Sequence, residues 1–177
     1  MKPRISSKWR DAVDVSLCRA CSQSEGLRYT IKKTEAIENP AKAREIFHNI
    51  TAQIPPSSWI GYTDSSVNSD SAACAFTFPK INVYGTFFLT KGSSILSAEL
   101  HGIKKALEAS YHHDTTPEEV YIFSNSRAAL LAINATSKDS QNPALLDIWD
   151  TLHALRTAGT YLTWIPSHIG IYGNKIK

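Results

Sequence analysis

The sequence predicts an α/β fold in which helices flank a mixed five-stranded sheet. Two short segments, 72–78 and 83–90, place apolar residues at every second position, one later segment is continuously apolar, and a segment between them has a helical period. Alternation is typical of strands with one buried face, and a continuous apolar run is typical of a strand buried on both faces. The predicted order is β-β-β-α-β-α-α-β, which joins a three-stranded antiparallel meander to parallel strands through helices.

The meander is predicted over residues 59–90. Strands are expected at 59–67, 72–78 and 83–90. The second has Ala72, Cys74, Phe76 and Phe78 on one face, Val83, Gly85, Phe87 and Leu89 alternate in the third, and the connections are short and polar. The remaining elements are predicted, in order, as a helix over 95–110 capped by Ser93 and Ser94, a buried strand over 120–123, a short helix from about Arg127, a helix from Asn142 and Pro143 to Gly159, and a strand over 160–166.

Residues 1–58 are predicted to be a basic leader, separate from a domain over 59–177. They carry ten Lys or Arg against six Asp or Glu, whereas residues 59–177 carry nine against ten. Pro55 and Pro56 mark the boundary because proline cannot continue a helix, and within the leader only residues 41–50 have a short helical pattern. Basic side chains contact nucleic-acid phosphates, so the leader is the expected source of such contacts.

The chain is expected to be soluble and intracellular, in the cytoplasm or nucleus, without a membrane partner. Its first residues are basic but lead into no apolar segment, and no apolar run approaches the roughly 20 residues of a membrane span. Three cysteines, an odd number, indicate free thiols in a reducing compartment.

Glu99 is the first candidate site residue. On a helical wheel it falls within the apolar arc of the helix over 95–110, so its carboxylate is expected to face the sheet. Burial of a carboxylate costs several kcal/mol unless a cation or strong donors accompany it. The alternative is a glutamate near the helix end that pairs with Lys or Arg.

Asp64 and Asn125 are two further candidates. Asp64 interrupts an apolar strand, and Asn125 follows the buried strand, where open α/β sheets place their ligands. Taken singly, an Asx turn at Asp64 and a helix N-cap at Asn125 are favoured. If the two strands are neighbours and the helix crosses them, Asp64, Glu99 and Asn125 converge, and their oxygens suit Mg²⁺.

The segments 62–66, 97–100, 123–126 and 164–174 together resemble the type 1 ribonuclease H domain. The most similar version is the one in reverse-transcriptase polyproteins of non-LTR retrotransposons. The resemblance covers about two thirds of the chain in the family's order. It implies a ribonuclease H-like sheet, RNA–DNA hybrid as substrate, and a possible origin of residues 1–58 as the remnant of an upstream polyprotein region.

The resemblance also implies the site residues. Family members bind two Mg²⁺ ions with four carboxylates, and a histidine assists turnover. Asp64 and Glu99 match the first two carboxylates, His168 matches the histidine, and Asn125 stands where the family has an Asp. The residues matched to substrate binding are Ser65, Ser66, Ser126 and Asn174.

Two departures weaken the expected site. The fourth carboxylate would lie beyond Asn174, where Lys175 replaces the usual acidic residue and the family's last helix is missing, so the domain is expected to be truncated there. Loss of that helix should expose apolar sheet surface. An active member cleaves the RNA strand by Mg²⁺-assisted attack of water and leaves a 5′-phosphate. Here we expect weak or absent cleavage; the alternatives are a non-catalytic nucleic-acid-binding module or a degenerate retroelement fragment.

Overall fold

The computed structural model describes residues 13–16, 33–115, 117–135, 141–155, 159–167 and 170, with only the backbone described for 13–16 and 33–35. The elements along this part of the chain are β1 (Val13–Ser16), α1 (Lys33–Glu38), α2 (Pro40–Ala52), β2 (Trp59–Val67), β3 (Ala72–Phe78), the 3-10 turn η2 (Pro79–Ile81), β4 (Val83–Leu89), α3 (Ile95–Tyr111), β5 (Glu119–Ser124), α4 (Arg127–Ala135), α5 (Pro143–Ala154) and β6 (Gly159–Trp164).

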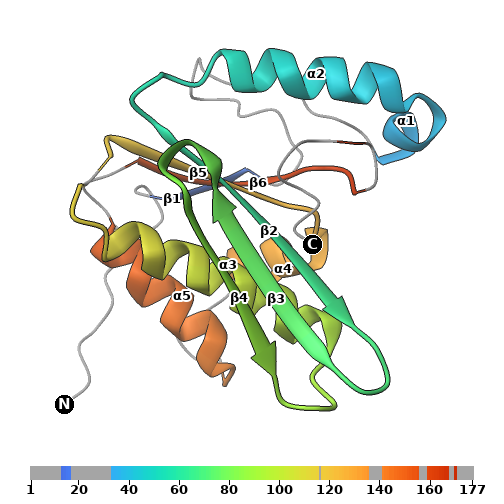
Figure 1. The fold of residues 1–177 in the computed structure, drawn as a ribbon, viewed down its shortest axis with the longest axis vertical. Coiled ribbons are helices and arrows are strands. Elements are labelled where there is room, and N and C mark those ends of the chain that lie inside the picture. Colours follow the sequence, from blue (N-terminus) through green and yellow to red (C-terminus); the bar gives the residue numbers. More distant parts are fainter. Residues whose placement is uncertain are drawn as a thin grey trace.

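The strands form one mixed sheet in the order β1-β6-β5-β2-β3-β4 (Figure 1). The antiparallel pairs β2–β3 and β3–β4 make the predicted meander, and β5 lies parallel to both β2 and β6. The α/β class and all five predicted strands are therefore confirmed. A sixth strand, β1, was not predicted; it pairs in parallel with β6, with Val13 opposite Thr160. Its four residues, Val-Asp-Val-Ser, alternate apolar and polar, but so short a run does not identify a strand without its partner β6.

Side-chain caps set the starts of the main helices. Ser94 Oγ accepts from the Ser97 amide at 3.1 Å at the start of α3, and Asn142 Oδ1 accepts from the Ala144 amide at 3.0 Å at the start of α5. Both caps confirm the predicted helix starts. The predicted end of the last helix at Gly159 is wrong. The helix ends at Ala154, where the Leu155 amide closes onto Thr151 O at 2.9 Å, and Gly159 already belongs to β6.

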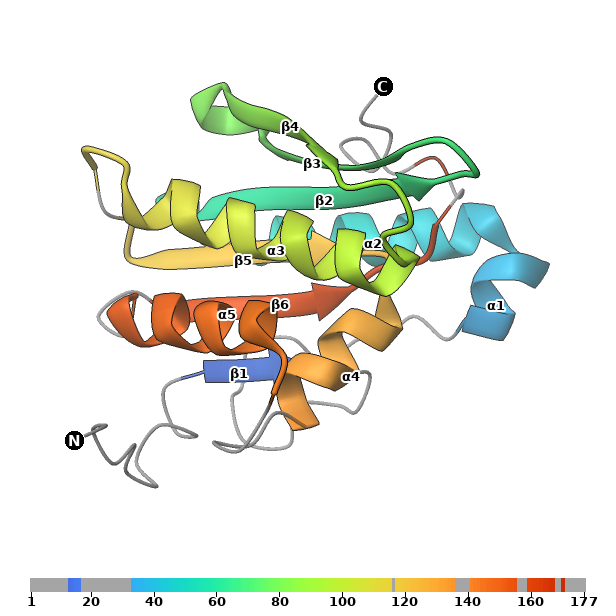
Figure 2. The same cartoon turned by 90° about the horizontal axis from the view of Figure 1, so that it is seen from below.

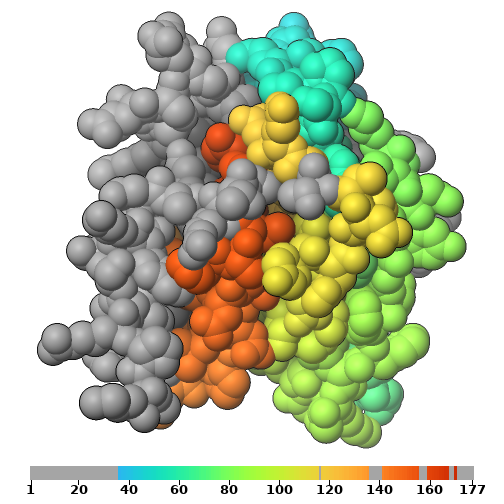
Figure 3. Space-filling model, turned by 90° about the vertical axis from the view of Figure 1, so that its left-hand side faces the viewer, coloured from blue at the N-terminus to red at the C-terminus, as the bar shows by residue number. Residues whose placement is uncertain are grey.

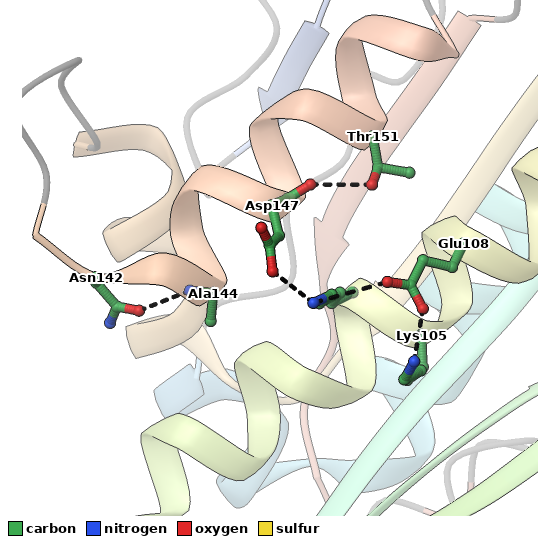
Figure 4. A network of polar contacts seen from close by, with 7 residues as sticks. Lys105, Glu108, Asn142, Ala144, Asp147 and Thr151 are labelled. Carbon is green, nitrogen blue, oxygen red and sulfur yellow. Dashed lines mark hydrogen bonds and ion pairs between the residues drawn. The ribbon is translucent and has the colours of Figure 1, made fainter.

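The two faces of the sheet have separate cores. Figure 2 shows α3 and α5 in front of the sheet and α2 behind it. On the front face α3, α4 and α5 bury a large aliphatic cluster that includes Leu107, Leu130 and Ile148. Figure 3 shows α3 and α5 packed against each other over this core. Where they meet, Lys104 Nζ lies 2.5 Å from Asp147 Oδ2, in a network that includes Lys105 and Glu108 (Figure 4).

The second face is covered by residues that the sequence assigned to the leader. Phe47 of α2 is buried against Tyr62 and Phe123, with ring centroids 6.4 and 5.2 Å apart, and the same cluster includes Ile50 and Ile165. The boundary predicted at residue 58 therefore does not divide the core. The expected exposure of apolar sheet surface is also wrong for β2 and β5, because α2 lies over them. No helix in the described ranges is long and apolar enough to cross a membrane.

Candidate functional site

Asp64 and Asn125 meet where β2 and β5 separate. Thr63 opposite Ser124 is the last pair of the two parallel strands, so the next residues along each strand are neighbours. Asn125 Nδ2 donates a hydrogen bond to Asp64 Oδ1 at 3.0 Å, and the Ser65 amide donates to the same oxygen at 3.0 Å. The sequence prediction that these two residues converge is confirmed.

Asn125 is positioned by its neighbours and does not cap α4. Trp164 of β6 donates its indole N–H to the Asn125 carbonyl at 3.1 Å. The cap of α4 is Ser126, whose Oγ accepts from the Ala129 amide at 3.3 Å, while the Ser126 amide donates to Ser124 Oγ at 3.1 Å. The favoured assignment of Asn125 as the N-cap is therefore wrong. Because Ser126 takes that role, the Asn125 amide is left to face Asp64.

Glu99 enters the site from α3 and faces the sheet, as the wheel predicted. Its side chain is 6% exposed, and Oε2 has no hydrogen-bond partner within the described structure. Burial raises the pKa of Glu99 to about 7, with the Asp64 charge as the second cause, and the Ser65 hydroxyl offsets part of the rise. The alternative of a helix-end glutamate paired with Lys or Arg finds no support, because no cation among the described side chains forms an ion pair with it.

Unpaired buried oxygens are found on Glu99 and on the two residues that flank Asp64. Within the described chain, the buried side-chain atoms without a hydrogen-bond partner are Thr63 Oγ1, Ser65 Oγ and Glu99 Oε2. Thr63 and Ser65 flank Asp64 on β2. Buried polar groups normally find partners, so these unpaired oxygens on Glu99 and on the two neighbours of Asp64 mark a place suited to a ligand, an ion or water.

At Gly102, α3 lies close to the sheet. A Cβ on Gly102 would be in ordinary contact, 3.4 Å from the Cys74 Cβ and 3.8 Å from Ser65 Oγ, so alanine would fit and only side chains larger than alanine would meet the sheet. Cys74 is a free thiol in this layer; burial raises its pKa to about 11, with the Glu99 charge as the second cause. Sequence reasoning missed Gly102 and Cys74 as parts of the site. The available signal was a single glycine inside a helical pattern, which usually has a packing reason.

The oxygen atoms of Asp64, Glu99 and Asn125 are of the kind that a hard divalent cation binds. Asp64 and Glu99 supply at most two negative charges, and Asn125 would have to turn its amide to present Oδ1 instead of Nδ2. Among the residues that the structure describes, no group of three or more His, Cys, Asp or Glu side chains is placed to hold a metal ion. Two carboxylates and an amide nevertheless fit one Mg²⁺ that keeps several waters. They do not fit the two ions that the resemblance implies.

The remaining predicted site residues are Ser65, Ser66, His168 and Asn174. Ser65 is partly buried beside Glu99, whereas Ser66 is exposed on β2. His168 and Asn174 lie outside the described residues.

In comparisons with known proteins, no family model matches the chain and no curated protein matches it. The fold and the site thus define an α/β protein with a small acidic and amide cluster where two parallel strands separate.

Proposed function

We propose that the chain is a ribonuclease H type 1-like domain, related to those of non-LTR retrotransposon polyproteins, that binds RNA–DNA hybrid and cleaves its RNA strand weakly or not at all. The supporting observation is the contact between Asp64 and Asn125 at 3.0 Å, with the buried carboxylate of Glu99 beside them. A carboxylate, a second carboxylate from the crossing helix and an amide at the third position follow the order along the chain that the resemblance to the family implies.

The chemistry follows from what each residue supplies. Asp64 and Glu99 would hold one Mg²⁺, which when bound would activate a water and stabilise the charge that develops at the phosphate. Asn125 contributes no charge, and its N–H group already satisfies one oxygen of Asp64. The Ser65 hydroxyl lies next to the Glu99 carboxylate, where it can help to orient a bound water.

The same set of residues explains why cleavage is expected to be weak. The site holds two carboxylates, and a Glu99 pKa of about 7 leaves this one partly protonated at neutral pH. If the missing charges weaken stabilisation of the transition state by about 4 kcal/mol, the rate falls roughly a thousandfold. We therefore expect hybrid binding to survive better than cleavage.

The full chain should be tested with a labelled RNA–DNA hybrid in Mg²⁺ and in Mn²⁺. We expect preferential binding of the hybrid over duplex DNA, and any slow cleavage should leave a 5′-phosphate and be abolished by the isosteric change Asp64→Asn. Equal binding of hybrid and duplex DNA would overturn the proposal. Turnover as fast as that of an intact family domain would overturn the expected weakness alone.

A second candidate is a non-catalytic nucleic-acid-binding module. The amide of Asn125 favours it, because the N–H group partly balances Asp64 without a metal ion. Phosphate contacts would come from the basic residues of the segment 1–58, in which Lys and Arg exceed Asp and Glu by four. Deletion of residues 1–58 would remove α2 and β1 from the fold, so the informative variant changes Lys2, Arg4, Lys8 and Arg10 to Gln. If this variant bound the hybrid with unchanged affinity and unchanged salt dependence, the result would argue against this second candidate function.

A further inference from the structure

The outer strand of the meander, β4, is an edge without the usual protection. It closes one end of the sheet order, and among the described strands it pairs only with β3 (Figure 2). Its seven residues, Val83–Leu89, contain no charged residue and no proline. Natural sheets guard exposed edges with lysine, proline or bulges, because the unpaired backbone groups otherwise recruit another strand. An uncharged edge of this length is therefore suited to pairing.

The two faces of β4 differ sharply. On the inner face Phe87 stacks on Phe76, with ring centroids 6.2 Å apart, and Phe76 also covers Gly85. On the outer face Tyr84 and Phe88 are 72% and 84% exposed, with Thr86 between them. The inner face thus has its packing partners within the chain, whereas the two outward aromatic rings lack theirs.

We propose that β4 is a homodimer interface, on which a second copy of this chain adds its own β4 antiparallel about a two-fold axis at Thr86. In that register Tyr84 lies opposite Phe88 of the second copy, and Phe88 lies opposite its Tyr84. One seven-residue strand thereby makes two identical cross-strand aromatic pairs, and such pairs stabilise antiparallel strands. A two-fold interface requires this kind of self-complementary surface.

The surroundings of β4 favour a second copy over a nucleic acid. The strand has no cation to meet phosphates, and the flanking lysines are engaged: Lys91 pairs with Asp70 at 3.3 Å, and Lys80 donates to the Pro56 carbonyl. The helix α3 packs mainly over β2 and β3, so it leaves the outer side of β4 open. Pairing of two seven-residue strands buries less area than a standard interface, so we expect a weak dimer with roughly micromolar or weaker affinity.

The test is sedimentation velocity of the full chain over a wide concentration range, with three variants. Tyr84→Lys with Phe88→Lys puts like charges opposite each other in both pairs and should weaken association about tenfold or more. Tyr84→Glu with Phe88→Lys puts opposite charges together in this register alone, so association should return. Leu131→Lys removes an exposed apolar side chain from α4 and should leave association unchanged.

Folding of each variant is checked by circular dichroism, and these exposed positions should tolerate the changes. A wild-type chain that stays monomeric at every concentration would overturn the proposal. It would also be overturned if both double variants associated equally well, because the register would then play no part. Binding of single-stranded oligonucleotide by a monomeric wild-type chain, lost in the double-lysine variant, would assign the aromatic rings to nucleic acid instead.

Discussion

Substitution of Glu99 by Gln should change how the stability of the protein depends on pH. The pKa of this carboxyl rises from 4.5 to about 7 on folding, mainly through burial. Between these values the folded chain holds a proton at Glu99 that the unfolded chain has released. The free energy of unfolding therefore falls as the pH rises through this window and levels off above pH 7. The difference between 4.5 and 7, at about 1.36 kcal/mol per pH unit, corresponds to about 3 kcal/mol.

The measurement is urea unfolding of wild type and Glu99→Gln between pH 5 and 8, in buffer with a chelator to remove divalent cations. Wild type should lose about 2 to 3 kcal/mol of stability over this range through Glu99, and the variant should lose correspondingly less. The quantity to compare is the slope of the free energy of unfolding against pH. Its absolute value is less informative, because the buried Gln amide also changes stability at every pH through its own unpaired groups. As a control, Glu118→Gln removes an exposed carboxylate away from the site and should keep the wild-type slope. Parallel pH profiles for wild type and Glu99→Gln would refute the burial argument.

Three further changes test the site and the fold. Mg²⁺ should raise the unfolding midpoint of wild type more at pH 8 than at pH 5, because ionised Asp64 and Glu99 bind it better; equal shifts, or shifts that persist in Asp64→Asn, would contradict this. Asn125→Asp should cost about 1 to 2 kcal/mol in chelator at pH 8 by setting a charge 3.0 Å from Asp64, and should increase the Mg²⁺ effect while restoring little cleavage. Phe47→Ala should cost about 3 to 5 kcal/mol in urea unfolding if α2 belongs to the core, and below about 1 kcal/mol if it is a detachable leader.

Local patterns were sufficient for most of the sheet. The strands at 59–67 and 72–78 were predicted with the bounds that they have, because apolar runs and short polar turns are features of a few consecutive residues. Residues 40–52 show the limit of this reasoning. Their helical pattern was visible, but nothing within it says that Phe47 packs on Phe123, which lies 76 positions away in the sequence. Non-local packing decides whether such a segment is a leader or part of the core.

The site residues also divide into those that local sequence patterns predict and those that depend on non-local packing. Periodicity placed Glu99 toward the sheet, because the direction of a helical side chain is set locally. Asn125 was harder, since Ser124, Asn125 and Ser126 can all cap a helix. Which of the three caps α4 depends on how the adjacent strands orient their side chains. Ser126 caps α4, and the register between β2 and β5 turns Asn125 toward Asp64.

The electrostatics of the site suggest how it remains folded without a full set of metal ions. A third carboxylate at position 125 would add a charge next to Asp64, and repulsion among the carboxylates would then have to be balanced by cations. The neutral amide of Asn125 instead donates to Asp64, and partial protonation of Glu99 near pH 7 removes more of the repulsion. The features that stabilise the metal-free site are thus the ones that lower its affinity for Mg²⁺. Stability in chelator and affinity for Mg²⁺ should therefore respond in opposite directions to Asn125→Asp, which a simple loss of folding cannot reproduce.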